Sequence, residues 1–205
     1  MGRENSNWKV SNHSKVFTTK YISGEEWAAK NERTGKFVKY LVLKEPDYVE
    51  VIGLDANGNI ILIEQDHIAS GRGVQAVAGR IEEDESPEKA ARREFIEETG
   101  WSAGKVYPMG RAVPQSNRFV SLTTPNEAKT AHLFIASDCT AGPRTFDGAE
   151  DIKPIIIPFN TAMDCVASGA PLPKLNLRID DMGTQLLLLK LWEHQRLFPS
   201  IKRIP

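Results

Sequence analysis

Three glutamates of one short segment, Glu94, Glu97 and Glu98, are the side chains of this sequence most suited to chemistry. Their i, i+3 and i+4 spacing places all three carboxylates on one face if the segment is helical. Each like-charge pair on a helix costs about 0.2–0.5 kcal/mol, and negative charge near a helix C-terminus is disfavoured further. A divalent cation offsets this penalty directly, because carboxylate oxygens are hard ligands that suit Mg²⁺ or Mn²⁺. The alternative interpretation is a solvated acidic face, which is common on surface helices.

The segment that carries these glutamates has the start and stop signals of a helix over residues 87–99. The signals are Ser86 at the N-cap, Pro87 at the first helical position and Gly100 at the C-terminal cap. Ala91 and Phe95, at i and i+4, form an apolar stripe with Ile96 beside it. We therefore expect one face of the helix to pack on a core while the glutamates face a site.

The residues around the glutamates extend the pattern to G-x5-E-x7-R-E-F-x-E-E-x-G-W. This segment resembles the signature of the Nudix hydrolases, which has Gly, Glu and the run Arg-Glu-apolar-x-Glu-Glu-x-Gly-apolar at the same spacings. Every fixed position of the signature is filled, by Gly79, Glu85, Arg93, Glu94, Phe95, Glu97, Glu98, Gly100 and Trp101.

The resemblance implies an α/β fold, a Nudix-type α/β/α sandwich with a mixed sheet. It implies that Glu94 and Glu98 bind Mg²⁺ or Mn²⁺, with Glu97 as an additional ligand. It would also add the Ala78 carbonyl as a further ligand of the metal. A helix face with several carboxylates can hold more than one such ion.

The resemblance also implies the reaction, in which water cleaves a diphosphate that is linked to another group. Divalent ions neutralise the charge of the diphosphate and lower the pKa of a bound water. Glu97 and Glu98 are the catalytic glutamates that the resemblance implies. It implies in addition that Glu85 and Arg93 form an ion pair that shapes the catalytic loop.

Strand patterns surround the signature. They cover residues 16–22, 37–43, 48–54, 60–65 and 74–79, and an Asn-Gly turn at residues 55–59 indicates a hairpin. Residues 114–129 read as a long polar loop, and residues 181–198 as an apolar C-terminal helix. We divide the chain into an N-terminal β-strand arm, residues 1–45, and a Nudix hydrolase domain, residues 46–205. Because the arm strands have no obvious partner inside a compact Nudix core, we expect the arm to form a homodimer.

Outside the signature, the chain is similar to the ADP-ribose pyrophosphatases and related nucleoside diphosphate sugar hydrolases. That branch has an N-terminal arm, a Gln-aromatic-Arg motif and a Glu-x-Pro-Ala-Gly motif, which correspond to residues 65–67 and 75–79 here. His67, Gln75 and Val77 stand where the branch has Arg, Glu and Pro. The resemblance implies that these positions line the nucleotide pocket, so His67 is expected to contact the substrate; the alternative is a structural histidine.

Downstream residues complete the expected site. Glu150 matches a loop glutamate that serves the branch as a metal ligand or base, with Asp147 and Asp151 as alternatives and a solvated loop acid as the plainer interpretation. Arg111 and Arg118 could hold a phosphate oxygen through a guanidinium fork. Exposed surface arginines are the alternative for both.

The resemblance implies a Mg²⁺-dependent pyrophosphohydrolase, and the branch it points to makes ADP-ribose, cleaved to AMP and ribose 5-phosphate, the expected substrate. GDP-mannose or another nucleotide sugar is the second candidate substrate. A Nudix-fold sensor that binds a nucleotide without cleaving it is the alternative function, although a sensor has no need of an intact set of metal-binding glutamates.

Composition argues against nucleic acid and membranes as partners, and the resemblance implies a small-molecule nucleotide and a second copy of the chain instead. The net charge of -1 argues against a general nucleic-acid or anionic-membrane binder. No apolar run approaches the ~20 residues of a membrane span. The two cysteines, Cys139 and Cys165, form neither a metal spacing nor a disulfide framework, so we expect a reducing, cytoplasmic location.

Overall fold

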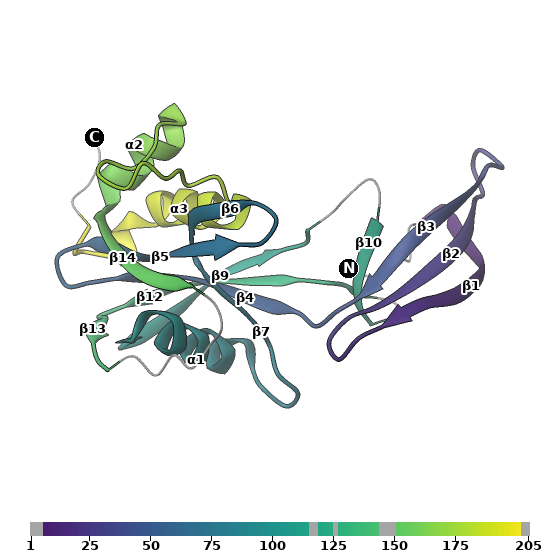
Figure 1. The fold of residues 1–205 in the computed structure, drawn as a ribbon, viewed down its shortest axis with the longest axis horizontal. Coiled ribbons are helices and arrows are strands. Elements are labelled where there is room, and N and C mark those ends of the chain that lie inside the picture. The colour runs from purple at the N-terminus through teal and green to yellow at the C-terminus, as the bar shows by residue number, and fades with distance from the viewer. Residues whose placement is uncertain (1–5, 115–118, 125–126, 144–150, 202–205) are drawn as a thin grey trace. The chain divides into compact units, whose positions relative to one another are not determined.

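The computed structural model describes residues 6–114, 119–124, 127–143 and 151–201 and divides the chain into two compact units (Figure 1). The first unit contains Met1–Tyr48 and Arg111–Ala131, and the second contains Val49–Gly110 and His132–Pro205. The predicted boundary after residue 45 lies near the first crossing between the units. The sequence pattern had, however, assigned residues 111–131 to the hydrolase domain.

The first unit is a five-stranded sheet in the order β1-β2-β3-β10-β11. Its strands are β1 Trp8–Thr18, β2 Ser23–Asn31, β3 Phe37–Lys44, β10 Phe119–Thr124 and β11 Glu127–Ala128. β1, β2 and β3 are antiparallel neighbours, whereas β10 runs parallel to β3. Trp27 and Val42 form a small core with Val10 packed against it, and nearly all of β1 is exposed. The sheet therefore buries little of its own apolar surface.

Strands β10 and β11 lie within residues 114–129, which the sequence pattern predicted to be a loop. β10 takes its hydrogen bonds from β3, which lies far away in the chain. A local pattern cannot reveal such pairing, because the partner that satisfies the backbone is distant in sequence. The loop prediction is therefore wrong for residues 119–124 and 127–128.

The second unit is built on a seven-stranded sheet whose main path is β14-β5-β4-β12-β9, with β6 paired to β5 and β7 to β4. Its strands are β4 Tyr48–Leu54, β5 Asn59–His67, β6 Gly71–Gln75, β7 Val77–Arg80, β9 Lys105–Ala112, β12 Ala131–Ser137 and β14 Ile152–Pro158. Two short strands, β8 Trp101–Ser102 and β13 Thr140–Ala141, form a separate pair. The helices are α1 Pro87–Thr99, α2 Phe159–Ser168 and α3 Met182–Glu193, followed by a 3-10 turn, η2 Gln195–Leu197.

The helices cover both faces of this sheet. Figure 1 shows α1 on one side and α3 on the other, so the second unit has the layers of the predicted α/β/α sandwich. Beneath α1, the fully buried Val51, Ile61, Ile63 and Phe95 belong to one apolar cluster. The predicted α/β fold class is confirmed.

In the strands that precede α1, the predicted hairpin is present, but residues 74–79 do not form the single strand that was predicted. The predicted hairpin forms between β4 and β5, and the Asp55 carboxylate accepts hydrogen bonds from the backbone N–H groups of Asn57 and Asn59, both at 2.8 Å. Residues 74–79, predicted as one strand, are instead divided between β6 and β7 at Ala76. β6, before Ala76, pairs with β5, whereas β7, after Ala76, pairs with β4. The change of partner divides the segment.

Helix α1 has the predicted bounds and caps. The Ser86 hydroxyl accepts a hydrogen bond from the Lys89 N–H at 3.3 Å, and Gly100 ends the helix with a left-handed φ of 74°. Ala91 and Phe95 are fully buried as predicted, but Ile96 is 36% exposed. Glu98 is buried instead, at 7% exposure, and at i+7 and i+3 it continues the face that carries Ala91 and Phe95.

Helix α3 is anchored to the strand crossing at Ala76. The Asp181 carboxylate caps the helix by accepting hydrogen bonds from the Thr184 N–H (2.7 Å) and the Thr184 hydroxyl (2.6 Å). The same hydroxyl accepts a hydrogen bond from the Ala76 N–H at 2.7 Å. One fully buried hydroxyl thus joins the start of α3 to the crossing between β6 and β7.

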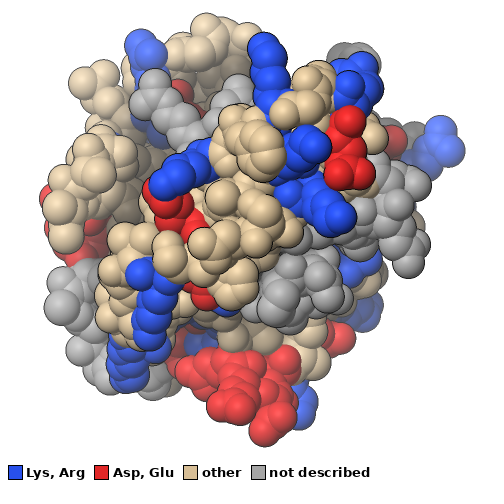
Figure 2. Space-filling model, turned by 90° about the vertical axis from the view of Figure 1, so that its right-hand side faces the viewer, with Lys and Arg blue, Asp and Glu red and all other residues tan. Residues whose placement is uncertain are grey.

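The surface carries charges of both signs. On the face shown in Figure 2, Lys and Arg side chains gather in several groups and Asp and Glu form a compact patch at the lower edge, so neither sign covers the face. This mixture agrees with the net charge of -1. None of the helices in the described ranges combines the length and apolar character needed to cross a membrane.

We expect Thr184→Val to lower the free energy of unfolding by about 1–3 kcal/mol, because it leaves the buried Ala76 N–H without its acceptor. Urea denaturation measures the change. Thr140→Val, at an exposed threonine of β13, is the matched control and should change stability by much less. Equal unfolding midpoints for the two variants would contradict the anchoring role of Thr184.

Candidate active site

Arg93 is the centre of the candidate site. Its guanidinium holds the Glu85 carboxylate through two hydrogen bonds, from Nε at 3.0 Å and from Nη2 at 2.8 Å. Nη2 also donates to the Arg80 carbonyl at 2.9 Å, and Glu85 accepts from the Glu82 N–H at 3.2 Å. A planar guanidinium suits this two-pronged contact with a carboxylate. Arg93 therefore fixes the loop between β7 and α1 to the first turns of the helix.

The same guanidinium faces the predicted metal-binding glutamates. Nη1 of Arg93 donates to Glu94 at 2.7 Å and lies 3.3 Å from Glu97. This positive charge offsets part of the like-charge repulsion along α1. The repulsion by itself therefore does not require a divalent cation, contrary to the inference drawn from the spacing of the glutamates.

The pKa values of Glu85 and Glu94 are shifted in opposite directions by their surroundings. Hydrogen bonds from Arg93 lower the pKa of Glu85. Burial raises the pKa of Glu94, and nearby Glu97 and Glu85 raise it further, although Arg93 opposes them. A carboxylate that is desolvated in this way favours an additional positive charge beside it. Glu94 is thus suited to gain a cation, whereas Glu85 is already satisfied by Arg93.

The three glutamates of α1 differ in exposure. The Glu98 residue is only 7% exposed, the Glu94 side chain is 15% exposed and the Glu97 side chain is 45% exposed. Gly79 of β7 lies directly against the Glu94 carboxylate, since a Cβ built on Gly79 would overlap it. The backbone of β7 at Gly79 therefore lies beside the helix face. The preceding residue, Ala78, carries the carbonyl that is a predicted ligand.

The donors fit a hard divalent cation in type, since they are carboxylates beside a backbone segment. Within the part of the chain that the structure describes, no three acidic, His or Cys side chains already converge as a metal cluster. Arg93 holds Glu94 and Glu97 through the same nitrogen. Arg93 contacts one oxygen of each carboxylate, so the second oxygen of Glu94 and of Glu97 could bind an ion while both contacts to Arg93 are kept.

His67 lies at the end of β5 in a chain of hydrogen bonds with Gln75 and Gln65. His67 Nε2 and Gln75 Oε1 are 2.7 Å apart, and Gln75 Nε2 donates to Gln65 at 2.9 Å. Because Gln75 uses its amide nitrogen toward Gln65, its oxygen faces His67, which must donate from Nε2. These two positions, where the related branch carries Arg and Glu, hold an imidazole and an amide that hydrogen-bond to each other.

Of the remaining candidate residues, the structure describes Arg111 and Asp151. Arg111 is exposed and belongs to the first unit. Arg118, Glu150 and its alternative Asp147 lie outside the described residues. Asp151, the other alternative, forms an ion pair with Arg72 of β6, which lowers the pKa of Asp151.

Sequence reasoning missed Arg72. Its guanidinium bonds to Glu64 at 2.7 Å, contacts Asp151 and lies 3.7 Å from Asp66. Only the pairing of Asp66 opposite Arg72 in the β5–β6 hairpin was available as a local signal. Asp151 is distant in the chain, so its contact depends on the pairing of β14 with β5.

Comparisons with known proteins agree with this geometry. The chain matches the NUDIX domain over residues 44–163, which is more than half of its length, and it belongs to the Nudix family. The named pyrophosphatases among its relatives identify it as a hydrolase of the Nudix type.

Three similar proteins illustrate the relationship. The GDP-mannose pyrophosphatase of Yersinia pestis (strain Pestoides F) is 32% identical over 154 residues, covering 70% of this chain and 68% of that protein. The ADP-ribose pyrophosphatase of Bacillus subtilis (strain 168) is 28% identical over 138 residues, covering 65% of this chain and 70% of that protein. A crystal structure of an ADP compounds hydrolase shares the fold, with a TM-score of 0.74, 16% identity and coverage of 96% and 98% of the two chains.

We expect Gly79→Ala to lower the rate of hydrolysis by about 10²-fold, because the new methyl group displaces the Glu94 carboxylate. The displaced group is the end of a flexible side chain, so the fold should survive. Steady-state kinetics on a substrate of the unmodified enzyme measures the rate, and urea denaturation checks the fold. A folded variant with full activity would show that the position of Glu94 is unimportant.

A second prediction concerns pH. Because Arg93 lowers the pKa of Glu85 in the folded state, their contact stabilises the fold above the unfolded-state pKa of about 4.3. This stability is lost as the pH falls through the lower folded-state value. The difference in unfolding free energy between the unmodified chain and Glu85→Gln should therefore be largest near pH 7 and shrink in acid.

Urea denaturation between pH 3 and pH 7 measures that difference. Glu83→Gln removes the same charge at an exposed position of the same loop and controls for net charge. A Glu85→Gln difference that does not change with pH would contradict the role of the ion pair.

Proposed function

We propose that the protein is a Mg²⁺-dependent pyrophosphohydrolase of nucleoside diphosphate sugars. The observation that carries the proposal is the arrangement on α1, where Arg93 links Glu85, Glu94 and Glu97 beside the buried Glu98. This arrangement supplies desolvated carboxylates next to a backbone segment at one helix face. It supports hydrolysis better than a sensor function, because binding alone needs no such set of acids.

The residues that would hold the metal are Glu94 and Glu98, with Glu97 and the Ala78 carbonyl as further ligands. When bound, Mg²⁺ or Mn²⁺ neutralises the charge of the diphosphate and lowers the pKa of the attacking water. Arg93 keeps Glu94 oriented toward β7 and holds the preceding loop in place.

ADP-ribose is the proposed substrate, with AMP and ribose 5-phosphate as products. The Bacillus subtilis relative carries the name of that activity. GDP-mannose is the second candidate. It is supported by the Yersinia relatives named for that activity, which are 32% identical to this chain, against 28% for the Bacillus subtilis relative. Both substrates are purine nucleoside diphosphates linked to a sugar, so the same helix would serve either.

The roles of four other residues belong to the same proposal. His67 would contact the substrate, which its half-buried position beside Gln75 permits. Arg111 and Arg118 would bind phosphate oxygens, and Glu150 would act as the base or as a further metal ligand.

A panel of nucleotides tests the proposed function. The chain is incubated with Mg²⁺ and ADP-ribose, GDP-mannose or other nucleotide sugars, and products are identified by mass. We expect a nucleoside monophosphate and a sugar phosphate, and a chelator should abolish their formation. Binding of ADP-ribose without turnover of any diphosphate would favour the sensor.

Glu98→Gln is the matched catalytic control for this panel. It keeps the size of the side chain but removes its charge, and we expect turnover to fall by about 10²-fold or more. Circular dichroism shows whether the fold survives. A folded and fully active variant would count against the assignment of Glu98.

We further propose that the N-terminal arm, residues 1–45, forms a homodimer. The first unit exposes several large apolar side chains, among them Trp8, Val16, Phe17, Tyr21 and Phe37. Surface of this kind on a sheet with a small core favours contact with another chain. Light scattering at micromolar concentration should give twice the monomer mass, and a monomer would refute the proposal.

A further inference from the structure

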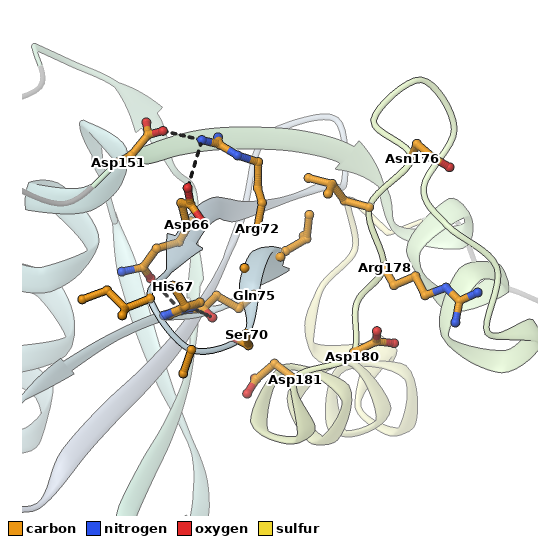
Figure 3. A pocket seen from close by; sticks show the side chains of 17 residues that line it. Asp66, His67, Ser70, Arg72, Gln75, Asp151, Asn176, Arg178, Asp180 and Asp181 are labelled. Carbon is orange, nitrogen blue, oxygen red and sulfur yellow. Dashed lines mark hydrogen bonds and ion pairs between the residues drawn. The ribbon is translucent and has the colours of Figure 1, made fainter.

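Arg72 of β6 joins the β5–β6 hairpin to the start of β14. Its guanidinium donates from Nη1 to the Glu64 carboxylate at 2.7 Å and from Nη2 to the Asp151 carboxylate. The Asp66 carboxylate lies 3.7 Å from the same Nη2. Figure 3 shows Asp66 and Asp151 both directed toward this guanidinium. Because Glu64 and Asp66 belong to β5 and Asp151 comes directly before β14, one side chain connects three segments.

Asp151 is held by its backbone as well as by its side chain. Its carbonyl accepts a hydrogen bond from the Asp66 N–H at 3.2 Å. The next residue, Ile152, is 2% exposed and belongs to the apolar cluster beneath α1, together with Phe95. Phe95 directly follows Glu94 in the helix. The start of β14 is therefore attached both to the hairpin and to the core under the acidic helix.

The position of the Asp151 side chain depends on the charge of Arg72 more than on packing. The side chains of Asp151 and Asp66 are 53% and 52% exposed. Without the guanidinium, the carboxylates of Glu64, Asp66 and Asp151 would repel one another. Ile152 would remain in the core. Loss of Arg72 should therefore release the Asp151 side chain while the fold survives.

Folding stability alone does not account for this contact. Ion pairs with side chains as exposed as that of Asp151 contribute little to stability, because water screens them. Arg72 nevertheless reaches a residue far away in the chain, at the point where β14 begins. The contact is better explained by the position that it gives to this point.

We propose that Arg72 is a positioning residue for hydrolysis, which holds Asp151 and thereby limits where the preceding residue, Glu150, can lie relative to α1. The proposal rests on the proposed function, in which Glu150 acts as the base or as a further metal ligand. Either role needs the Glu150 carboxylate close to the glutamates of α1. Consecutive Cα atoms are only about 3.8 Å apart, so a displacement of Asp151 is passed on to its neighbour. A misplacement of about 1 Å can lower the rate of an enzyme about 10²-fold.

The kinetic test uses Arg72→Met, which removes the guanidinium but keeps an unbranched side chain. We expect kcat for the nucleotide sugar that the unmodified chain hydrolyses to fall about tenfold, while KM changes by less than about twofold. Arg72→Lys keeps a positive charge without the planar guanidinium and should recover part of the loss. Arg196→Met, at an exposed arginine of η2, is the matched control and should leave kcat unchanged.

A double-mutant cycle separates positioning from a general loss of structure. In Glu150→Gln, the further change Arg72→Met should have little effect on kcat, because the group that Arg72 positions is already gone. Urea denaturation establishes that each variant is folded. A loss by the same factor with and without Glu150→Gln would overturn the proposal, as would full activity in folded Arg72→Met or folded Glu150→Gln.

Hydrogen exchange measures the contact without turnover. The Asp66 N–H is bonded to the Asp151 carbonyl, so NMR should show its exchange accelerated about tenfold in Arg72→Met and unchanged in Arg196→Met. If the chain hydrolyses no nucleotide sugar, the proposed function fails, and this measurement still decides whether Arg72 holds Asp151. Equal exchange in Arg72→Met and the unmodified chain would show that Arg72 does not hold it.

Discussion

The contact between Arg93 and Glu85 is the interaction on which the arrangement of the site depends. One guanidinium holds the loop after β7 through Glu85 and the Arg80 carbonyl, and its remaining nitrogen faces Glu94 and Glu97. Without it, the acids of α1 would repel one another at the end of the helix that least tolerates negative charge. The Arg93 guanidinium therefore both holds the loop in place and supplies positive charge to the acids of α1. Each glutamate contacts it in a different way.

Burial makes the pKa of Glu94 differ from that of Glu85, although both carboxylates contact Arg93. Glu85 is satisfied by Arg93 and has a lowered pKa, whereas the pKa of Glu94 is raised by burial in spite of the same arginine. Gly79 allows β7 to approach Glu94 at a distance that no larger residue permits. A cation bound here would relieve the desolvation of Glu94 rather than the repulsion along the helix. This reverses the reasoning suggested by spacing alone.

The helix face of α1 gathers carboxylates suited to cations and hence to phosphates. Around β6, by contrast, Arg72 is paired with Glu64, Asp66 and Asp151, and Gln75 joins His67 to Gln65. The segment before α3 is held by the same helix, through the bond from Gln185 to the Ile179 carbonyl. Asp181 caps this helix and Thr184 joins it to Ala76, so the start of α3 links three parts of the second unit.

Local chemistry was sufficient to predict the bounds of α1 and the Asp55 turn, and the spacing of the signature residues was sufficient for the family, whose resemblance implied the ion pair between Glu85 and Arg93. Each of these depends on residues close together in the chain. The strand β10, the division of residues 74–79 at Ala76 and the contact of Arg72 with Asp151 could not be predicted in this way. Each of these depends on a partner from another segment of the chain. The residues around a strand or a charged side chain do not show which other segment will supply its hydrogen bonds or its opposite charge. The exposure of Ile96 and the burial of Glu98 have the same origin, since folding decides which side of a helix meets the core.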